Sequence, residues 1–203
     1  MKIKICGLCR EEDVSFANEA MPDFVGFVFA PSRRHVSPSQ AARLRARLQE
    51  PIIPVGVFVN AAIAEIGALF ADGVIAIAQL HGTEDTAYLR DLKARCAVPV
   101  IRAVPVEGPE TLVPWQHKDP FADYLLLDSG PGGTGRPFQW DLLRSLKPAL
   151  PYFLAGGITL DNLKEGLSYR PYGIDVSSGV ETKGFKDRAK MIRLVRRVRE
   201  DKP

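Results

Sequence analysis

The sequence predicts a single α/β domain, a (β/α)8 TIM barrel covering residues 1–203, and two observations carry that prediction. Strand-like runs recur about every 25 residues with helical patterns between them, the length that one strand-plus-helix unit needs. Most runs are continuously apolar, which is typical of parallel strands covered on both faces. A doubly wound open sheet is the alternative, but it would normally carry a Gly-rich phosphate loop after its first strand. Here that turn is Cys6-Gly7-Leu8-Cys9.

Each expected strand is an apolar run that leads to a polar or small residue. The eight runs are Lys2–Cys6, Phe24–Phe29, Ile53–Val59, Val74–Leu80, Val98–Val104, Asp123–Asp128, Pro151–Ala155 and Ile174–Ser178. In the first run Ile3 and Ile5 alternate with lysines. This alternation places Lys4 on the outward side of the strand.

The helix starts are predicted from capping residues. Ser37 followed by Pro38 indicates an N-cap and a first turn, and Asn60, Thr83 and Thr159 are expected to cap three later helices. The expected inward faces are Ala41, Leu44 and Leu48; Ile63, Ile66 and Phe70; Leu89, Leu92 and Cys96; Leu160, Leu163 and Leu167; and Met191, Leu194, Val195 and Val198. The unit over 107–117 is the weakest, because glycine and prolines crowd a short helix.

Composition excludes several classes of protein. Hydrophobic residues make up 46% and charged residues 25% of the chain, which is ordinary for a globular domain, and the net charge of +3 is too small to indicate a nucleic-acid partner. There is no apolar stretch long enough to cross a membrane and no signal-peptide pattern. We therefore expect a cytoplasmic protein, a monomer or homodimer, without a nucleic-acid or membrane partner.

The three cysteines are an odd number and argue against a secreted disulfide framework. Cys6 and Cys9 form a C-x-x-C pair, which suits a redox pair or half of a zinc site. A four-cysteine zinc site is impossible because the chain has three cysteines, and the third, Cys96, lies on a predicted helix face. The plainer alternative is that Cys6 is a buried thiol at the end of a strand.

The candidate site residues stand where the strands end, because a barrel forms its active site at the carboxyl ends of its strands. Two late glycine turns occupy the usual phosphate position of this fold: Gly156-Gly157 after the seventh strand and Ser178-Gly179 after the eighth. Their backbone N–H groups can approach an anion closely. The alternative is that these glycines only make tight turns.

Other strand ends carry acid–base or binding candidates. Asp128 follows an apolar run, and burial there would favour its protonated form, which suits a general acid. The alternative is a solvated Asp at the strand end that caps the following turn. The glycine-rich loop over 130–135 is a candidate for closure over a ligand. Arg34 and its neighbour Arg33 suit a carboxylate clamp or a solvated loop. Gln79 and His81 suit hydroxyl binding, although a lone histidine is more often structural.

Together these segments resemble the phosphoribosylanthranilate isomerase family of tryptophan biosynthesis, from residue 2 to about residue 200. The segments are Lys4-Ile5-Cys6-Gly7, Ser32-Arg33-Arg34-His35-Val36-Ser37-Pro38, Gln79-Leu80-His81-Gly82, Leu126-Leu127-Asp128-Ser129, Ala155-Gly156-Gly157-Ile158 and Asp175-Val176-Ser177-Ser178-Gly179-Val180-Glu181. The combination is far more specific than any one segment.

The resemblance implies a single-domain barrel without a cofactor or metal, which carries out an Amadori rearrangement of a phosphosugar. It implies that Cys6 is the general base and Asp128 the general acid. Arg34 would meet the anthranilate carboxylate, and Asp175 a sugar hydroxyl. Gly157, Ser178 and Gly179 would cradle the phosphate. Cys9 departs from the family, which usually has a polar residue there, and a disulfide with Cys6 would make activity depend on reductant.

Other functions remain open from the sequence. The histidine-pathway isomerase uses two Asp residues, one of them where this chain has Cys6, and indole-glycerol-phosphate synthase relies on lysine and glutamate. A ligand-binding barrel without catalysis would tolerate the loss of Cys6. A thiol-redox protein would need both Cys6 and Cys9.

Overall fold

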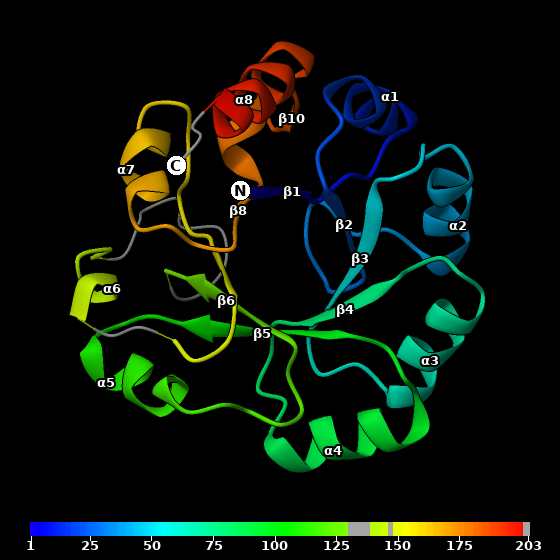
Figure 1. Cartoon of the computed structure of the whole chain (residues 1–203). Coiled ribbons are helices and arrows are strands. Elements are labelled where there is room, and N and C mark those ends of the chain that lie inside the picture. The colour runs from blue at the N-terminus through cyan, green and yellow to red at the C-terminus, as the bar shows by residue number, and fades with distance from the viewer. Residues whose placement is uncertain (130–138, 146–147, 201–203) are drawn as a thin grey trace.

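The computed structural model describes residues 1–129, 139–145 and 148–200. Its eight main strands are all parallel and close into a barrel in chain order, β1 to β8. Helices surround this ring (Figure 1). The predicted (β/α)8 barrel is therefore confirmed, and the open sheet is wrong.

The strands lie close to the predicted runs. They are β1 Lys2–Cys6, β2 Phe24–Val28, β3 Ile53–Phe58, β4 Ile77–Leu80, β5 Val100–Pro105, β6 Tyr124–Asp128, β7 Tyr152–Leu154 and β8 Gly173–Val176, followed by a small hairpin of β9 Glu181–Thr182 and β10 Phe185–Lys186. β4 begins three residues later than predicted. The backbone N–H groups of Val74 and Ile75 donate to the Leu69 carbonyl, so these two residues complete the preceding helix end instead of joining the sheet.

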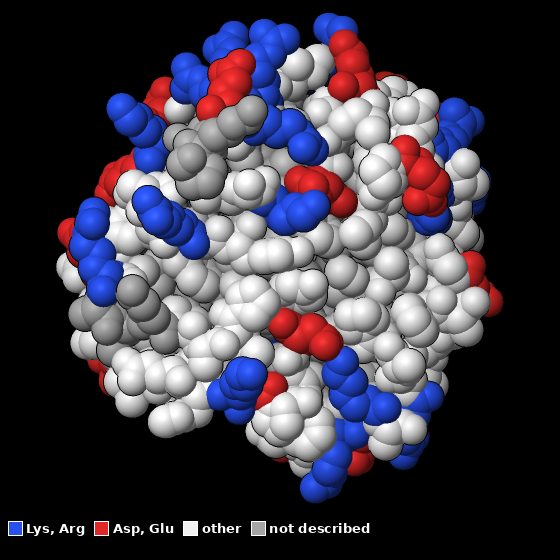
Figure 2. All heavy atoms as spheres, viewed as in Figure 1, with Lys and Arg blue, Asp and Glu red and all other residues white. Residues whose placement is uncertain are grey.

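The described helices follow the strands. They are α1 Glu11–Ala20, α2 Pro38–Ala46, α3 Ile63–Ala71, α4 Thr86–Arg95, α5 Pro109–Leu112, α6 Leu142–Ser145, α7 Leu163–Ser168 and α8 Arg188–Glu200, with 3-10 turns η1 Val113–Gln116 and η2 Ser178–Val180. The predicted weak unit is indeed one short helix and a 3-10 turn. Exposed basic residues of α8 gather at the top of Figure 2, while the apolar face of the helix is buried.

One of the four predicted caps is confirmed. Ser37 caps α2, and its hydroxyl accepts the Gln40 N–H at 3.2 Å. The other three are wrong: α3, α4 and α7 begin after Ala62, Asp85 and Asn162. The Asn60 and Thr83 side chains join two loops instead, and the Thr159 hydroxyl accepts the Asp161 N–H within its own turn at 3.2 Å.

Asn60 and Thr83 bond to each other across two neighbouring loops. The Asn60 side-chain oxygen accepts the Thr83 N–H at 3.0 Å and lies 3.2 Å from the Thr83 hydroxyl. The buried Glu84 carboxylate then accepts the Asn60 N–H at 2.6 Å and the Gly82 N–H at 2.8 Å. These contacts fix the loops after β3 and β4, which border the active-site end of the barrel.

The core has two layers. Between the barrel and its helices lies a large apolar layer that includes Ile3 and Ile5. Inside the barrel lies a smaller cluster that includes Phe24, Val55 and Phe153. No helix of the described residues is long and apolar enough to cross a membrane.

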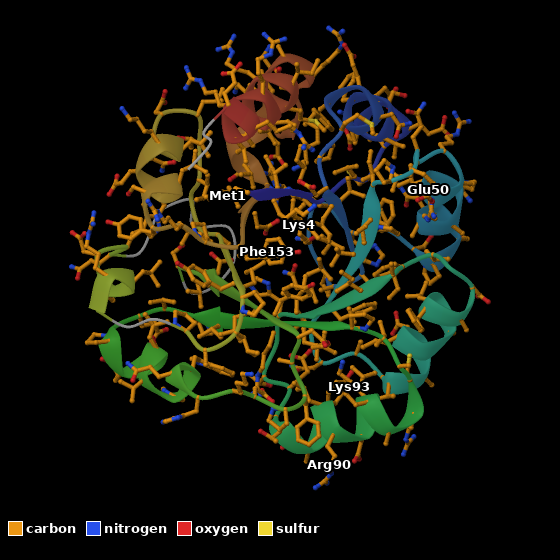
Figure 3. All side chains as sticks on the ribbon, in the orientation of Figure 1. Met1, Lys4, Glu50, Arg90, Lys93 and Phe153 are labelled. Atoms are coloured by element: carbon orange, nitrogen blue, oxygen red, sulfur yellow. The ribbon has the colours of Figure 1, made fainter. Side chains whose placement is uncertain are left out.

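Lys4 lies inside the barrel, so its predicted outward placement is wrong. Its side chain is 0% exposed, and Figure 3 shows it within the ring of strands. The reason is that both faces of a parallel barrel strand are covered. Ile3 and Ile5 pack under the helices, and the alternate residues Lys4 and Cys6 therefore face inward.

Candidate active site

A polar pocket opens at the carboxyl ends of β6, β7 and β8. Six residues predicted for the site line it: Arg34, Asp128, Gly156, Gly157, Asp175 and Ser178. Ser129 and Ser177 also line it, and the sequence reasoning gave neither of them a role. The structure thus brings together, in one hollow, residues that are up to 144 positions apart, from Arg34 to Ser178.

The loops after β7 and β8 form one wall of this pocket. Gly156 and Gly157 have φ angles of +77° and +68°, which glycine adopts without strain. Asn162 fixes their loop, because its side chain donates to the Gly157 carbonyl at 2.9 Å and accepts the Thr159 N–H at 2.8 Å. A side chain at Gly179 would collide with the Ile158 carbonyl oxygen, so this glycine allows the two loops to approach each other.

Asp128 ends β6 beside the Gly156 turn. Its Oδ1 accepts the Ser129 N–H at 2.7 Å, and its side chain is only 17% exposed. Burial raises the pKa of Asp128, while the nearby His81 and the Ser129 hydrogen bond oppose that rise and Asp175 adds to it. The protonated form that a general acid needs is therefore favoured. The glycine-rich loop that follows lies outside the described residues.

Gln79 and His81 form a series of side-chain contacts that ends at Asp128. The Gln79 amide nitrogen lies 3.0 Å from His81 Nδ1, and His81 Nε2 lies 3.5 Å from Asp128 Oδ2. With the amide donating to Nδ1, a neutral ring carries its proton on Nε2, which faces the carboxyl group. Gln79 is buried, and its side-chain oxygen has no partner among the described residues.

Cys6 ends β1 inside the barrel and is almost fully buried, at 8% exposed. Gly26 on β2 pairs with it, and a Cβ at Gly26 would lie 2.7 Å from the thiol sulfur, so only glycine leaves room for this sulfur. Burial raises the pKa of Cys6, and the Lys4 ammonium opposes that rise. Cys6, Cys9 and Cys96 are all free thiols, and the reductant dependence stays a prediction.

Arg34 is held at the pocket edge by Glu181. Its Nε and a terminal nitrogen donate to the two carboxylate oxygens at 2.7 and 3.1 Å. Glu181 also pairs with Arg33 at 2.6 Å and with the buried Lys186 at 2.9 Å. Although burial opposes it, hydrogen bonds from Arg34 and Lys186 lower the pKa of Glu181. One carboxylate thus orients three cations.

Sequence reasoning missed the roles of Lys4, Glu181 and Lys186. A usable signal existed for Lys4, because it stands two residues before Cys6 and must share its face of the strand. No comparable local signal existed for Lys186, which reaches Glu181 through the β9–β10 hairpin. Among the described residues, no group of three or more His, Cys, Asp and Glu side chains is placed to hold a metal ion.

The closed parallel barrel and the polar pocket at the carboxyl ends of its strands define the class of protein: a (β/α)8-barrel enzyme. The comparisons with known proteins narrow that class. A model of the family described as N-(5'phosphoribosyl)anthranilate (PRA) isomerase matches residues 3–197. The chain therefore belongs to the N-(5'-phosphoribosyl)anthranilate isomerase family, and it is an isomerase of tryptophan biosynthesis.

Curated relatives and solved structures agree with this family. The N-(5'-phosphoribosyl)anthranilate isomerase of Endomicrobium trichonymphae is 46% identical, with 98% of each chain covered. The Streptococcus mutans enzyme of the same name is 40% identical over 98% of this chain and 99% of its own. The phosphoribosyl anthranilate isomerase structure from Thermus thermophilus is 35% identical, covers 100% of both chains and has a TM-score of 0.88.

A further solved isomerase of this family holds a ligand. It is described as a complex with reduced 1-(o-carboxyphenylamino)-1-deoxyribulose 5-phosphate. It is 31% identical, covers 98% of this chain and 99% of its own, and has a TM-score of 0.83.

Proposed function

We propose that Cys6 is the general base and Asp128 the general acid of an Amadori rearrangement. In this reaction N-(5'-phosphoribosyl)anthranilate becomes 1-(2-carboxyphenylamino)-1-deoxyribulose 5-phosphate. One observation supports the proposal: Asp128 lines the pocket, and Cys6 adjoins it, because the hydroxyl of Ser177 in the pocket wall donates to the Cys6 carbonyl at 3.0 Å. An acid and a base around one pocket are what a proton-transfer isomerisation requires.

The acid step opens the sugar ring. Asp128 gives its proton to the furanose ring oxygen, the bond from that oxygen to C1 breaks, and the anthranilate nitrogen forms a protonated Schiff base with C1. Burial supports this role because it raises the pKa of Asp128 and so favours the protonated form.

The base step removes the proton from C2. The positive Schiff base makes that proton acidic, and the Cys6 thiolate takes it, which leaves an enolamine. The Cys6 thiol then returns a proton to C1, and the Asp128 carboxylate accepts the proton of the C2 hydroxyl, so that C2 becomes the ketone and both residues regain their starting states. The net change moves hydrogen from C2 to C1 and needs no redox cofactor.

The remaining pocket residues suit the two charged ends of the substrate. The phosphate fits the wall made by Gly156, Gly157 and Ser178, where backbone N–H groups can bind an anion, and Gly179 packs behind this wall against Ile158. The anthranilate carboxylate fits Arg34, whose guanidinium is already oriented by Glu181. Asp175, Gln79 and His81 remain for the hydroxyl groups of the sugar.

The test is the fall in phosphoribosylanthranilate fluorescence with the wild type, Cys6→Ser and Asp128→Asn side by side, and with the labile substrate generated in place. Each substitution should lower kcat by about 100-fold or more. Cys96→Ser and the exposed Asp161→Asn are matched controls that should keep the wild-type rate. Near wild-type turnover by Cys6→Ser or by Asp128→Asn would remove that residue from its role.

A further inference from the structure

A fully buried lysine with no part in these steps lies next to the proposed base. Lys4 faces the barrel interior on β1 and is 0% exposed. An ammonium group buried without partners is strongly destabilising, so a lysine in this place needs specific contacts with groups of opposite charge. Two acidic groups supply them.

The first is Asp175. It stands in register with Lys4 on the neighbouring strand β8, and its Oδ1 accepts from Lys4 Nζ at 2.9 Å. The second is the thiol of Cys6, two residues further along β1 on the same inward face, whose pKa the Lys4 charge lowers. The ammonium therefore lies between a carboxylate that lines the pocket and the proposed base.

The charges around Cys6 come from three strands. Burial raises the pKa of the Cys6 thiol most; Lys4 on β1 lowers it, Asp175 on β8 raises it, and Lys186 on β10 lowers it. Lys4 acts more strongly than Lys186. Lys186 directs its ammonium to the Glu181 carboxylate at 2.9 Å and the Ser177 carbonyl at 3.0 Å, so its charge is already matched.

Lys4 itself keeps its proton. Burial lowers the pKa of Lys4, but the combined effect of Asp175 and Cys6 is greater, and its pKa lies above the ordinary value. Lys4 is thus a fixed positive charge next to a sulfur that must become negative to act as a base.

We propose that Lys4 is a positioning residue for the reaction: its buried ammonium, anchored by Asp175, stabilises and orients the thiolate of Cys6. This inference rests on the proposed role of Cys6 as the base. The competing explanation is purely structural, in which Lys4 only joins β1 to β8 through its ion pair.

The experiment titrates the Cys6 thiol directly. The ultraviolet absorbance of the thiolate is followed against pH, as the difference between each protein and its Cys6→Ser version, which subtracts Cys9 and Cys96. Lys4→Met should raise the pKa of Cys6 by about one unit or more. The matched control is Lys2→Met on the same strand as Lys4, which breaks the exposed ion pair of Lys2 with Asp23 and should leave the thiol titration unchanged.

Activity gives a second readout of the same variants. Lys4→Met should lower kcat near neutral pH by about tenfold, as one pKa unit implies, recover part of it as pH rises, and change KM little. A wild-type thiol titration in folded Lys4→Met would overturn the proposal, whatever the activity. The role of Cys6 as the base is tested separately: that role is refuted only if Cys6→Ser retains activity.

Lys4→Met leaves the Asp175 carboxylate without its cation, which can prevent folding. A second variant tests the proposal in that case. Lys4→Met combined with Asp175→Asn removes both charges, and its readout is the thiol titration alone. The pKa of Cys6 should still lie above that of the wild type, since Lys4 affects the thiol more than Asp175 does. An unchanged or lower value would overturn the proposal.

Discussion

Gly26→Ala tests whether the position of the Cys6 sulfur controls the reaction. Gly26 lies on β2 directly beside Cys6. Its carbonyl also accepts the N–H groups of Gly7 and Leu8 at 2.9 and 3.0 Å, so it holds the turn that follows the thiol. Adding one methyl group here disturbs the sulfur without removing any charged or polar group.

The size of the disturbance follows from the geometry. The new Cβ would lie 2.7 Å from the sulfur and 3.1 Å from Cys6 Cα. Ordinary contacts between such atoms are about 3.5–4.0 Å, so the sulfur must move by about 1 Å. A shift of about 1 Å at a reacting group costs about 100-fold in rate, and overpacking a core costs about 1–3 kcal/mol of stability.

The assay is kcat from the fluorescence decay, with Tm measured on the same samples. Gly67→Ala is the matched control, because nothing lies within 4 Å of its new Cβ. Gly67 is within α3, so this control should stabilise the protein by about 0.5–1 kcal/mol and keep its rate. A folded Gly26→Ala variant with the wild-type kcat would refute the reasoning.

Three further substitutions test the rest of the site. Burial raises the pKa of Asp128, so ionisation of this carboxyl group destabilises the folded wild type as pH rises. Asp128→Asn has no such group, so its Tm minus the wild-type Tm should increase from acid to neutral pH, although its kcat is lost. Glu181→Gln should destabilise the protein by about 3 kcal/mol at neutral pH, since Lys186 loses its carboxylate partner, and it should raise KM, since Arg34 loses its support. Because the pKa of Glu181 is lowered, this loss of stability relative to the wild type should shrink as pH falls in the acid range. Asn162→Ala frees the loop after β7 and should raise both KM and the inhibition constant of inorganic phosphate by about tenfold, the loss of a hydrogen bond or two, with little change in kcat.

Local sequence signals predicted the elements whose ends depend on local contacts. Ser37-Pro38 is such a signal, because the serine hydroxyl caps its own helix. Asn60 and Thr83 look equally good as caps, but their partners come from each other's loop, 23 residues away in the chain. A capping pattern cannot reveal a tertiary partner that satisfies the same side chain first.

The same limit explains the outcome at the site. The positions of Asp128, Gly156 and Ser178 follow from the barrel rule that strand ends meet at one face, and the structure brings them to one pocket. The direction of Lys4 does not follow from its alternation with isoleucines, because both faces of a barrel strand are covered. A closed barrel makes the first and last strands neighbours, but the pairing of Lys4 with Asp175 also requires the register between them.

The most direct measurement is the isotope effect of deuterium at C2 of the ribosyl group, compared in the wild type and Lys4→Met. If Cys6 removes that proton with help from Lys4, the loss of Lys4 lowers the fraction of Cys6 that is thiolate, slows this step and makes it more rate-limiting. The account predicts slower turnover of the deuterated substrate and a larger isotope effect in Lys4→Met than in the wild type. A folded, slowed Lys4→Met enzyme that turns over both substrates equally fast would contradict it.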